Sequence, residues 1–120
     1  MQDIALVQTI ARTIDDKKAY NIAALTVSHL TVLCDYMVLA SGRTSTQVSA
    51  IADALDEKMT ELGVTAQRIE GKREARWIVM DYGNIIVHIF HQEEREYYNL
   101  ERLWEDGSNC LVLPFETEAK

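Results

Sequence analysis

Residues 77–90 read WIVMDYGNIIVHIF. Two strongly apolar runs, residues 77–81 and 85–90, flank the tripeptide Tyr82-Gly83-Asn84. Glycine and asparagine readily adopt the positive φ angles that a tight hairpin turn requires. This stretch therefore predicts two antiparallel strands joined by a β-hairpin.

The regions before the hairpin alternate between helical and strand patterns. Apolar residues recur at helical spacing from Ile4 to Ile14, with Asp3 as the predicted N-cap. Residues 22–28 and 36–40 are rich in apolar, small and β-branched side chains, which is typical of strands. We expect one amphipathic helix followed by two strands.

The clearest helical pattern covers residues 44–62. Thr44 and Gln47 occupy the two positions of a capping box, and the apolar side chains that follow lie on one helical face. Gly63 supplies the left-handed residue that commonly ends a helix. A shorter strand is predicted over residues 65–69.

Residues 94–105 predict a last helix. Tyr97, Leu100 and Trp104 fall on one stripe of this helix, whereas Tyr98 projects about 100° away. One face can therefore pack on the core while the other faces a partner. The alternative is that all of these rings belong to the core.

This order of elements predicts an α/β fold in a single domain, residues 1–107, followed by a C-terminal tail, residues 108–120. Its mixed sheet of about five strands is expected to be flanked by helices on both faces. No apolar run approaches the roughly 18 residues that span a bilayer, and the N-terminus lacks the basic residues of a signal peptide. We therefore expect a soluble cytoplasmic protein with no membrane contact.

The chain carries 12 basic and 19 acidic residues, which gives a net charge of −7. From Glu93 onward it has eight acidic and three basic residues. Because a negative field repels the phosphate backbone, this composition disfavours nucleic acid as the main partner and favours a basic protein. Four basic residues lie close together in the sequence: Arg68, Lys72, Arg73 and Arg76. They either contact RNA phosphates at the edge of a larger interface or are simply solvated.

No combination of side chains in the sequence is typical of a catalytic or metal site. His88 and His91 are an odd number of positions apart, so on one strand they point to opposite faces. Asp35 and Asp81 have no second acidic residue at close spacing. We therefore predict no enzyme activity, no cofactor and no bound metal. The turn at residues 41–46 allows two interpretations, a helix cap or a phosphate site built from free backbone N–H groups.

A combination of segments spread over residues 4–106 points to a known family. These segments are Ser41-Gly42-Arg43-Thr44-Ser45-Thr46-Gln47-Val48, Ala50-Ile51-Ala52-Asp53, Glu70-Gly71, Trp77, Asp81-Tyr82-Gly83, Val87-His88-Ile89-Phe90, Arg95, Tyr97-Tyr98, Leu100-Glu101 and Leu103-Trp104. Together they resemble the ribosomal silencing factor family, also called Iojap-like. The part from the hairpin to the last helix is the most specific.

The resemblance implies a domain related in topology to nucleotidyltransferases but without their catalytic residues. Those relatives use a Gly-Ser pair and an Asp-x-Asp pair, whereas this chain has Ser41-Gly42, and neither Asp35 nor Asp81 belongs to an Asp-x-Asp. The family resemblance further implies binding to a basic protein of the large ribosomal subunit, universal protein fourteen, at the face where the small subunit docks. Occupying that face would block subunit joining and repress translation when nutrients are scarce. The family also forms homodimers.

We predict that the partner-binding surface lies on the hairpin and the last helix, because aromatic residues dominate interface energetics. The alternatives are a nucleotidyltransferase-like enzyme that binds a nucleotide at the 41–46 turn, and a homodimeric adaptor that uses its aromatic face on itself. Trp77 and Phe90 fit a core position equally well. The predicted apolar contacts are Trp77, Met80, Tyr82, Phe90, Tyr98 and Leu100, and the predicted polar contacts are Asp81, His88 and Glu101.

Overall fold

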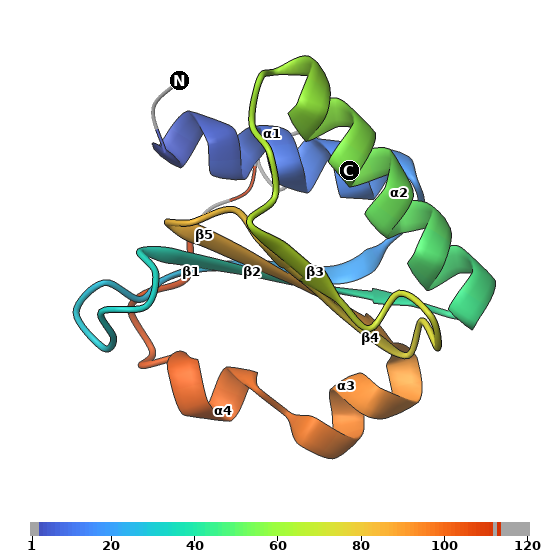
Figure 1. Cartoon of the computed structure of the whole chain (residues 1–120). Coiled ribbons are helices and arrows are strands. Elements are labelled where there is room, and N and C mark those ends of the chain that lie inside the picture. Colours follow the sequence, from blue (N-terminus) through green and yellow to red (C-terminus); the bar gives the residue numbers. More distant parts are fainter. Residues whose placement is uncertain (1–2, 112, 114–120) are drawn as a thin grey trace.

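The computed structural model, which describes residues 3–111 and 113, has a five-stranded sheet between two layers of helices (Figure 1). The predicted α/β class with a mixed sheet is confirmed. Within the described residues, no helix is both long and apolar enough to cross a membrane. The elements are α1 (Asp3–Asp16), β1 (Tyr20–Thr26), β2 (Tyr36–Gly42), α2 (Ser45–Glu61), β3 (Arg68–Glu70), β4 (Trp77–Asp81), β5 (Ile85–His91), α3 (Gln92–Tyr98) and α4 (Glu101–Trp104).

β2 and β5 form the centre of the sheet, whose strand order is β1-β2-β5-β4-β3. These two strands are parallel to each other, and the other neighbours are antiparallel. Every residue of β2 except Tyr36 is buried, and so is every residue of β5 except Ile86. Burial on both faces is what parallel strands in a layered α/β domain require.

The predicted hairpin is confirmed as β4 and β5. Trp77 at the start of β4 pairs with Phe90 near the end of β5. The turn is closed by the backbone N–H of Tyr82, which donates to the carbonyl oxygen of Ile85 at 2.9 Å. Gly83 has a φ of +88°, a conformation that glycine adopts without steric cost.

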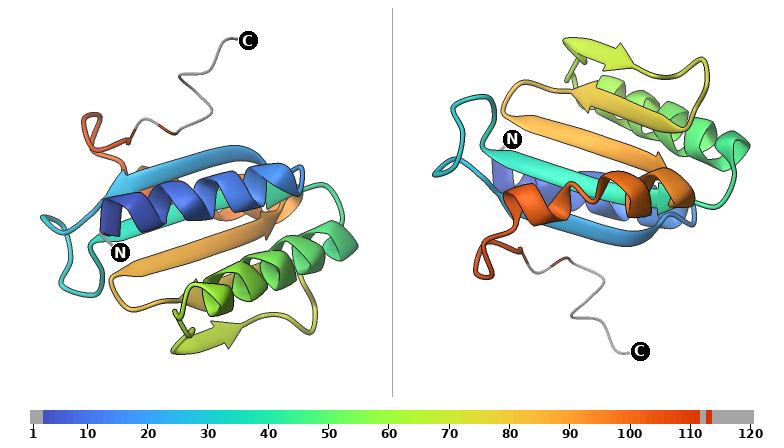
Figure 2. Two further views of the ribbon diagram at one scale, coloured as in Figure 1. Left: turned by 90° about the horizontal axis from the view of Figure 1, so that it is seen from above. Right: turned by 90° about the horizontal axis from the view of Figure 1, so that it is seen from below.

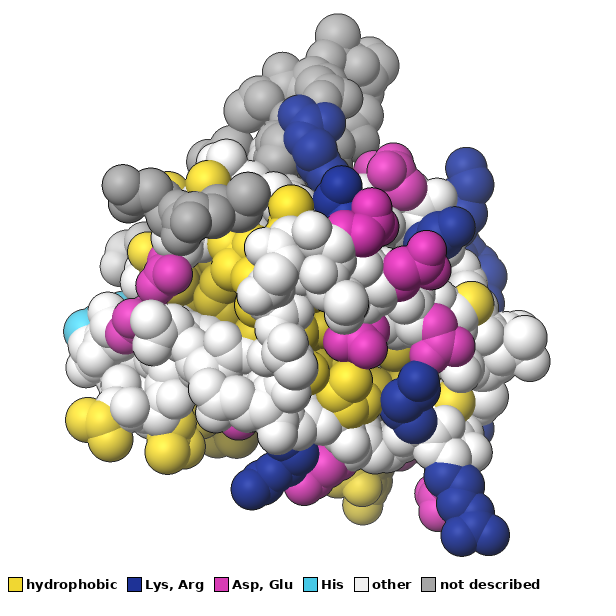
Figure 3. All heavy atoms as spheres, turned by 45° about the horizontal axis from the view of Figure 1, so that its top comes forward, with side chains coloured by type: hydrophobic (Ala, Val, Ile, Leu, Met, Phe, Trp, Pro, Cys, Tyr) yellow, Lys and Arg dark blue, Asp and Glu magenta, His cyan; other side chains and the backbone are white. Residues whose placement is uncertain are grey.

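α1 and α2 cover one face of the sheet and form the upper layer (Figure 2, left). The hydroxyl of Thr44 caps α2 by accepting the backbone N–H of Gln47 at 3.1 Å. The Gln47 side chain accepts the N–H of Arg43 at 2.7 Å, one residue earlier than a capping box would place this bond. Gly63, with a φ of +80°, follows the end of the helix as predicted. Acidic and basic side chains are interspersed on the outer surface of the upper layer (Figure 3), as on most solvated helices.

The lower layer differs from the single helix predicted over residues 94–105. Asn99 adopts a left-handed conformation with a φ of +47°, which separates α3 from the short α4. Because the break changes the direction in which Leu100 and Trp104 point relative to Tyr97, these three residues do not share one helical face as predicted. Tyr97 is 77% exposed, whereas Leu100 and Trp104 are partly buried against the sheet.

Two strand boundaries also differ from the sequence prediction. β3 is only three residues long, so the strand expected over residues 65–69 was placed too early. β1 begins at Tyr20, two residues before the predicted start, and has a register irregularity between Tyr20 and Ala23. Asn21 lies there with a φ of +50°, a backbone state that a simple strand pattern does not anticipate.

The chain after Gly107 lies along the open edge of β1. Cys110 forms an antiparallel bridge with Leu25, and the backbone N–H of Leu111 donates to the carbonyl oxygen of Ala24 at 2.8 Å. Leu113 is 1% exposed and joins the core between the upper layer and the sheet. Residues 114–120 of the predicted tail lie outside the described residues.

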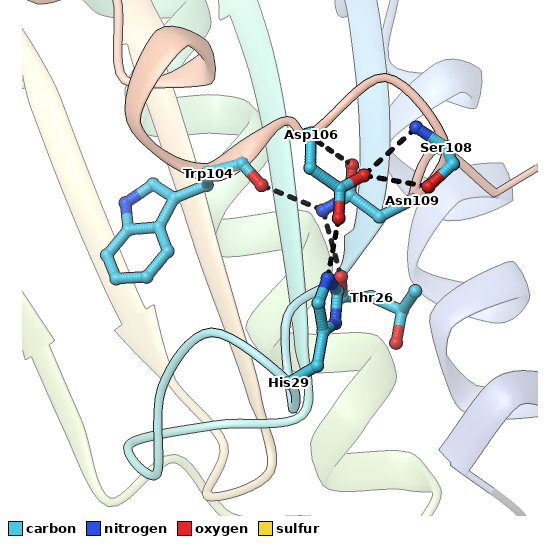
Figure 4. A network of polar contacts seen from close by, with 6 residues as sticks. All are labelled: Thr26, His29, Trp104, Asp106, Ser108 and Asn109. Atoms are coloured by element: carbon cyan, nitrogen blue, oxygen red, sulfur yellow. Dashed lines mark hydrogen bonds and ion pairs between the residues drawn. The ribbon is translucent and has the colours of Figure 1, made fainter.

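A network of polar contacts fastens this segment to the end of α4 (Figure 4). The Asn109 amide donates to the carbonyl oxygens of Thr26 and Trp104 at 3.0 and 2.7 Å. The Asp106 carboxylate contacts the His29 ring nitrogen Nε2 at 2.6 Å and also accepts from Ser108. The bond from His29, with those from Ser108, lowers the pKa of Asp106 to about 2. α4 is therefore tied to β1 and to the β1–β2 loop.

We expect Leu113→Ala to lower the free energy of unfolding by about 3 kcal/mol, because it leaves a cavity at a buried site. Leu103→Ala is the matched control, since Leu103 is 71% exposed on α4 and exposed sites usually change stability by less than about 0.5 kcal/mol. Urea denaturation measures both variants. Equal, small losses of the free energy of unfolding in the two variants would show that Leu113 is not part of the folded core.

Candidate functional site

The lower layer leaves part of the sheet without a covering helix. α3 and α4 lie across β1, β2 and the adjoining side of β5, while β4 and its side of β5 stay uncovered (Figure 2, right). Side chains alternate between the two faces along each strand. The uncovered surface, here called the open face, consists of Trp77, Val79 and Asp81 from β4 and Ile86 and His88 from β5.

The residues between these positions point to the other side of the sheet. Ile78, Met80, Val87 and Ile89 are all 0% exposed in the core beneath the upper layer. By contrast, every open-face residue except His88 is partly exposed. Two adjacent strands thus contribute one set of side chains to the core and the other set to a half-covered surface.

Trp77 is the centre of an aromatic cluster at one end of the open face. Its ring stacks on Phe90 with a centroid distance of 5.0 Å and an interplanar angle of 26°. Tyr98 of α3 lies on it with a centroid distance of 4.9 Å and an angle of 43°. Trp77 is partly buried and Tyr98 is 48% exposed. Offset ring contacts of this kind fix side-chain orientation, so the indole is held in place without being covered.

His88 orients the same indole through a hydrogen bond. The Trp77 Nε1–H donates to His88 Nδ1 at 3.1 Å. Burial lowers the pKa of His88 to about 4, because a charged imidazolium would lose its hydration. The ring is therefore neutral at pH 7, which leaves Nδ1 free to accept.

The structure brings six of the predicted site residues to the lower side of the sheet. Asp81 and His88 join Trp77 on the open face, and Tyr98 lies at its border. Phe90 is 1% exposed and supports Trp77 from within the core, while Leu100 is partly buried in the same cluster. The first four residues therefore form one continuous surface, and Phe90 and Leu100 support it from within.

Two other predicted residues, Met80 and Tyr82, do not contribute side chains to this surface. Met80 is 0% exposed in the core on the opposite side of the sheet, because neighbours in a strand face opposite ways. Tyr82 is buried in that core too, and its hydroxyl donates to the Asp56 carboxylate of α2 at 3.1 Å. Glu101 is the first residue of α4, and its side chain lies outside the described part of the structure.

Two open-face residues were missed by the sequence analysis. Val79 and Ile86 are aliphatic, and hydrophobicity alone does not separate them from the core residues beside them. The alternation of β4 and β5 was sufficient to find them, because Val79 is two positions from Trp77 and Ile86 is two positions from His88.

A hollow of about 370 Å³ adjoins the aromatic cluster. Trp77 and Tyr98 form its apolar wall, and Arg76 bonds the Glu94 carboxylate at 2.8 Å on its polar side. Gly71 also lines it, with a φ of +89°, and a Cβ there would lie 2.1 Å from the carbonyl oxygen of Trp77. Only glycine lets the loop pass this close to the start of β4.

The basic group predicted on the loop before β4 is mostly ion-paired. Arg68 lies 3.5 Å from Glu70, Lys72 bonds Asp53, and Arg76 bonds Glu93 and Glu94. Arg73 has no ion pair with any residue that the structure describes. The positive charge of this loop is therefore largely neutralised within the protein.

Some polar groups of the 41–46 turn and the start of α2 bond to one another. The N–H groups of Arg43, Gln47 and Val48 all bond within the turn and the first turn of α2. The Ser41 hydroxyl accepts from the buried Arg95 at 2.9 Å. A Cβ at Gly42 would lie 2.9 Å from the Val48 side chain, which explains the glycine by packing. These contacts favour the helix cap over the phosphate site.

The described residues contain no group of three or more His, Cys, Asp or Glu side chains placed to hold a metal ion. His91 instead caps α3, with its Nδ1 accepting the N–H of Glu93 at 3.2 Å.

Comparisons with known proteins agree with this picture. The family model described as "Ribosomal silencing factor during starvation" matches residues 1–120. The ribosomal silencing factor RsfS of Halalkalibacterium halodurans is 40% identical over 107 residues, which cover 89% of this chain and 92% of that protein. RsfS of Bacillus subtilis is 39% identical over 107 residues, which cover 89% and 91%.

Solved structures have the same fold. A crystal structure from Bacillus halodurans matches with a TM-score of 0.82 and 37% identity, covering 92% of this chain and 100% of that one. A crystal structure from Chromobacterium violaceum matches with a TM-score of 0.85 and 29% identity, covering 97% and 98%.

Burial of neutral His88 predicts a loss of stability in acid. Its folded pKa of about 4 lies below the ordinary value of 6.5, so the unfolded state takes up a proton first as the pH falls. Between pH 6.5 and 4, we expect the free energy of unfolding to drop by about 3 kcal/mol from this group. Denaturation of the wild type and of His88→Asn across this range measures it.

The Asn variant should show a flatter dependence on pH. The pKa of Asp106 is lowered to about 2. The contribution of ionised Asp106 to the free energy of unfolding is therefore lost at a lower pH and does not mask the loss caused by His88. Parallel curves for the two proteins would contradict a buried neutral histidine.

Proposed function

The chain belongs to the ribosomal silencing factor family, and from this premise we propose that it represses translation by docking its open face on the large ribosomal subunit. The bound protein then stands where the small subunit would join. The observation that carries the proposal is an oriented and partly exposed tryptophan, Trp77, at one end of the open face.

The open face has the features of a protein-binding surface. Trp and Tyr are enriched among residues that dominate binding energy. Trp77 and Tyr98 are held by ring contacts before any partner arrives, so little side-chain freedom is lost on binding. Val79 and Ile86 extend the apolar area along the strands.

The partner is a basic protein of the large subunit, and the family resemblance names universal protein fourteen. The net charge of −7 accelerates encounter with a basic surface and disfavours wrong orientations. Asp81 is partly exposed on the open face and can pair with a cationic side chain. One of its carboxylate oxygens accepts the Gly83 N–H at 2.8 Å, so its position is fixed.

Repression by this route requires occupancy and no turnover. A micromolar dissociation constant corresponds to a binding free energy of about −8 kcal/mol, which a small number of well-placed anchors can supply. Within the described residues, no metal cluster accompanies the 41–46 turn.

Two further features of the family remain predictions for this chain. A homodimer would use the same aromatic surface on itself, and sedimentation with and without large subunits would detect it. Arg73 would make any peripheral contact with ribosomal RNA, because its charge is not paired within the described residues.

We expect Trp77→Ala to weaken binding to purified large subunits at least about 30-fold, because truncating an aromatic anchor costs around 2 kcal/mol or more. Tyr98→Ala and Glu101→Ala should each weaken it less. Co-sedimentation measures binding, and thermal denaturation shows that each variant is folded. Unchanged binding by all three folded variants would reject the open face as the docking surface.

A matched pair of valines provides the control. Val79→Asp places a charge on the open face and should reduce binding to large subunits. Val32→Asp makes the same change in the β1–β2 loop, where Val32 is fully exposed, and should bind as the wild type does. Equal effects of the two substitutions would mean that added negative charge, rather than the open face, determines affinity.

A further inference from the structure

The hydrogen bond between Trp77 and His88 determines where His88 carries its proton. An indole N–H can only donate, so His88 Nδ1 must accept in the 3.1 Å contact. A neutral imidazole has one N–H and one bare nitrogen. The proton therefore resides on Nε2. The low pKa of His88, about 4, agrees with a neutral ring.

The Nε2–H has no partner among the residues that the structure describes. The only hydrogen bond of the His88 ring to these residues is the one with Trp77. No buried side-chain nitrogen or oxygen in that part of the chain lacks a partner, so Nε2 retains contact with solvent although His88 as a whole is 8% exposed. A fixed donor thus stands among apolar side chains of the open face.

We propose that His88 is a specificity-determining residue of the open face, whose Nε2–H donates a hydrogen bond to a neutral oxygen of the bound partner. This inference rests on the proposed function. The acceptor is a backbone carbonyl, a side-chain amide or a hydroxyl. A carboxylate is disfavoured, because Asp81 lies on the same face and the protein carries a net charge of −7.

The geometry gives this donor its selectivity. A binding partner covers the open face and removes water from Nε2, so a partner without an acceptor leaves the N–H unsatisfied. Surfaces that lack an acceptor at this point are thereby rejected. The same ring orients Trp77, which ties the position of the main anchor to the position of the donor.

His88→Asn separates the two roles of the ring. The amide oxygen of asparagine can take the place of Nδ1 and keep the bond from Trp77, but no donor remains at the position of Nε2. We expect binding of the purified large subunit to weaken about 3- to 10-fold, the loss of one buried hydrogen bond, while the indole N–H resonance of Trp77 stays in place. His91→Asn is the matched control, because asparagine also caps helices well and His91 lies outside the open face.

The wild-type protein provides a second measurement that needs no variant. Nitrogen NMR of the His88 ring should show the proton on Nε2, and its exchange with water should slow when the purified large-subunit protein is added. A proton on Nδ1, or unchanged exchange in the complex, would overturn the proposal. So would wild-type affinity in His88→Asn with an unmoved Trp77 resonance.

The outcomes distinguish this inference from the proposed function. If Trp77→Ala loses binding and His88→Asn does not, the open face remains the docking surface and the donor role is rejected. If Trp77→Ala, Tyr98→Ala and Glu101→Ala also bind normally, the docking surface itself is rejected.

Discussion

Unequal burial of the two sides of the hairpin is the constraint on which the rest of the structure depends. On the upper side, α2 packs over β4 and β5, and Met80 and Ile78 are inaccessible to solvent. On the lower side, a short and interrupted helical layer covers only part of the sheet (Figure 2, right). The same two strands therefore stabilise the domain with one face and leave the other available for a partner.

The main aromatic side chain of the open face is partly exposed and yet held in a fixed orientation. An exposed tryptophan on a mobile segment would lose conformational freedom on binding and bind weakly. Trp77 instead lies between Phe90 and Tyr98, and its N–H is held by His88. A surface organised in this way suits a factor that acts by occupying a site, because its affinity comes from shape and position rather than from chemistry.

Much of the fold could be predicted from the sequence, and the reasons are local. The turn residues of the hairpin specify its register, and the cap and stop of α2 specify its ends. The break at Asn99 was not predicted, because residues 94–105 keep a helical pattern. Asn99 nevertheless adopts the left-handed state that asparagine tolerates at helix ends, and Leu100 and Trp104 beyond it pack on the sheet. The contact of residues 109–111 with β1 is likewise set by tertiary packing.

The candidate site, like the fold, could be predicted only in part from the sequence. Aromatic residues led to the lower side of the sheet, but hydrophobicity alone added Met80 and Tyr82 and omitted Val79 and Ile86, since it ignores which way a strand residue faces. The most direct test of the central claim is to mix the purified protein with separated ribosomal subunits and measure how many whole ribosomes form. The account predicts that their fraction falls as the protein is added and levels off at saturation. Undiminished subunit joining at a saturating dose would contradict it.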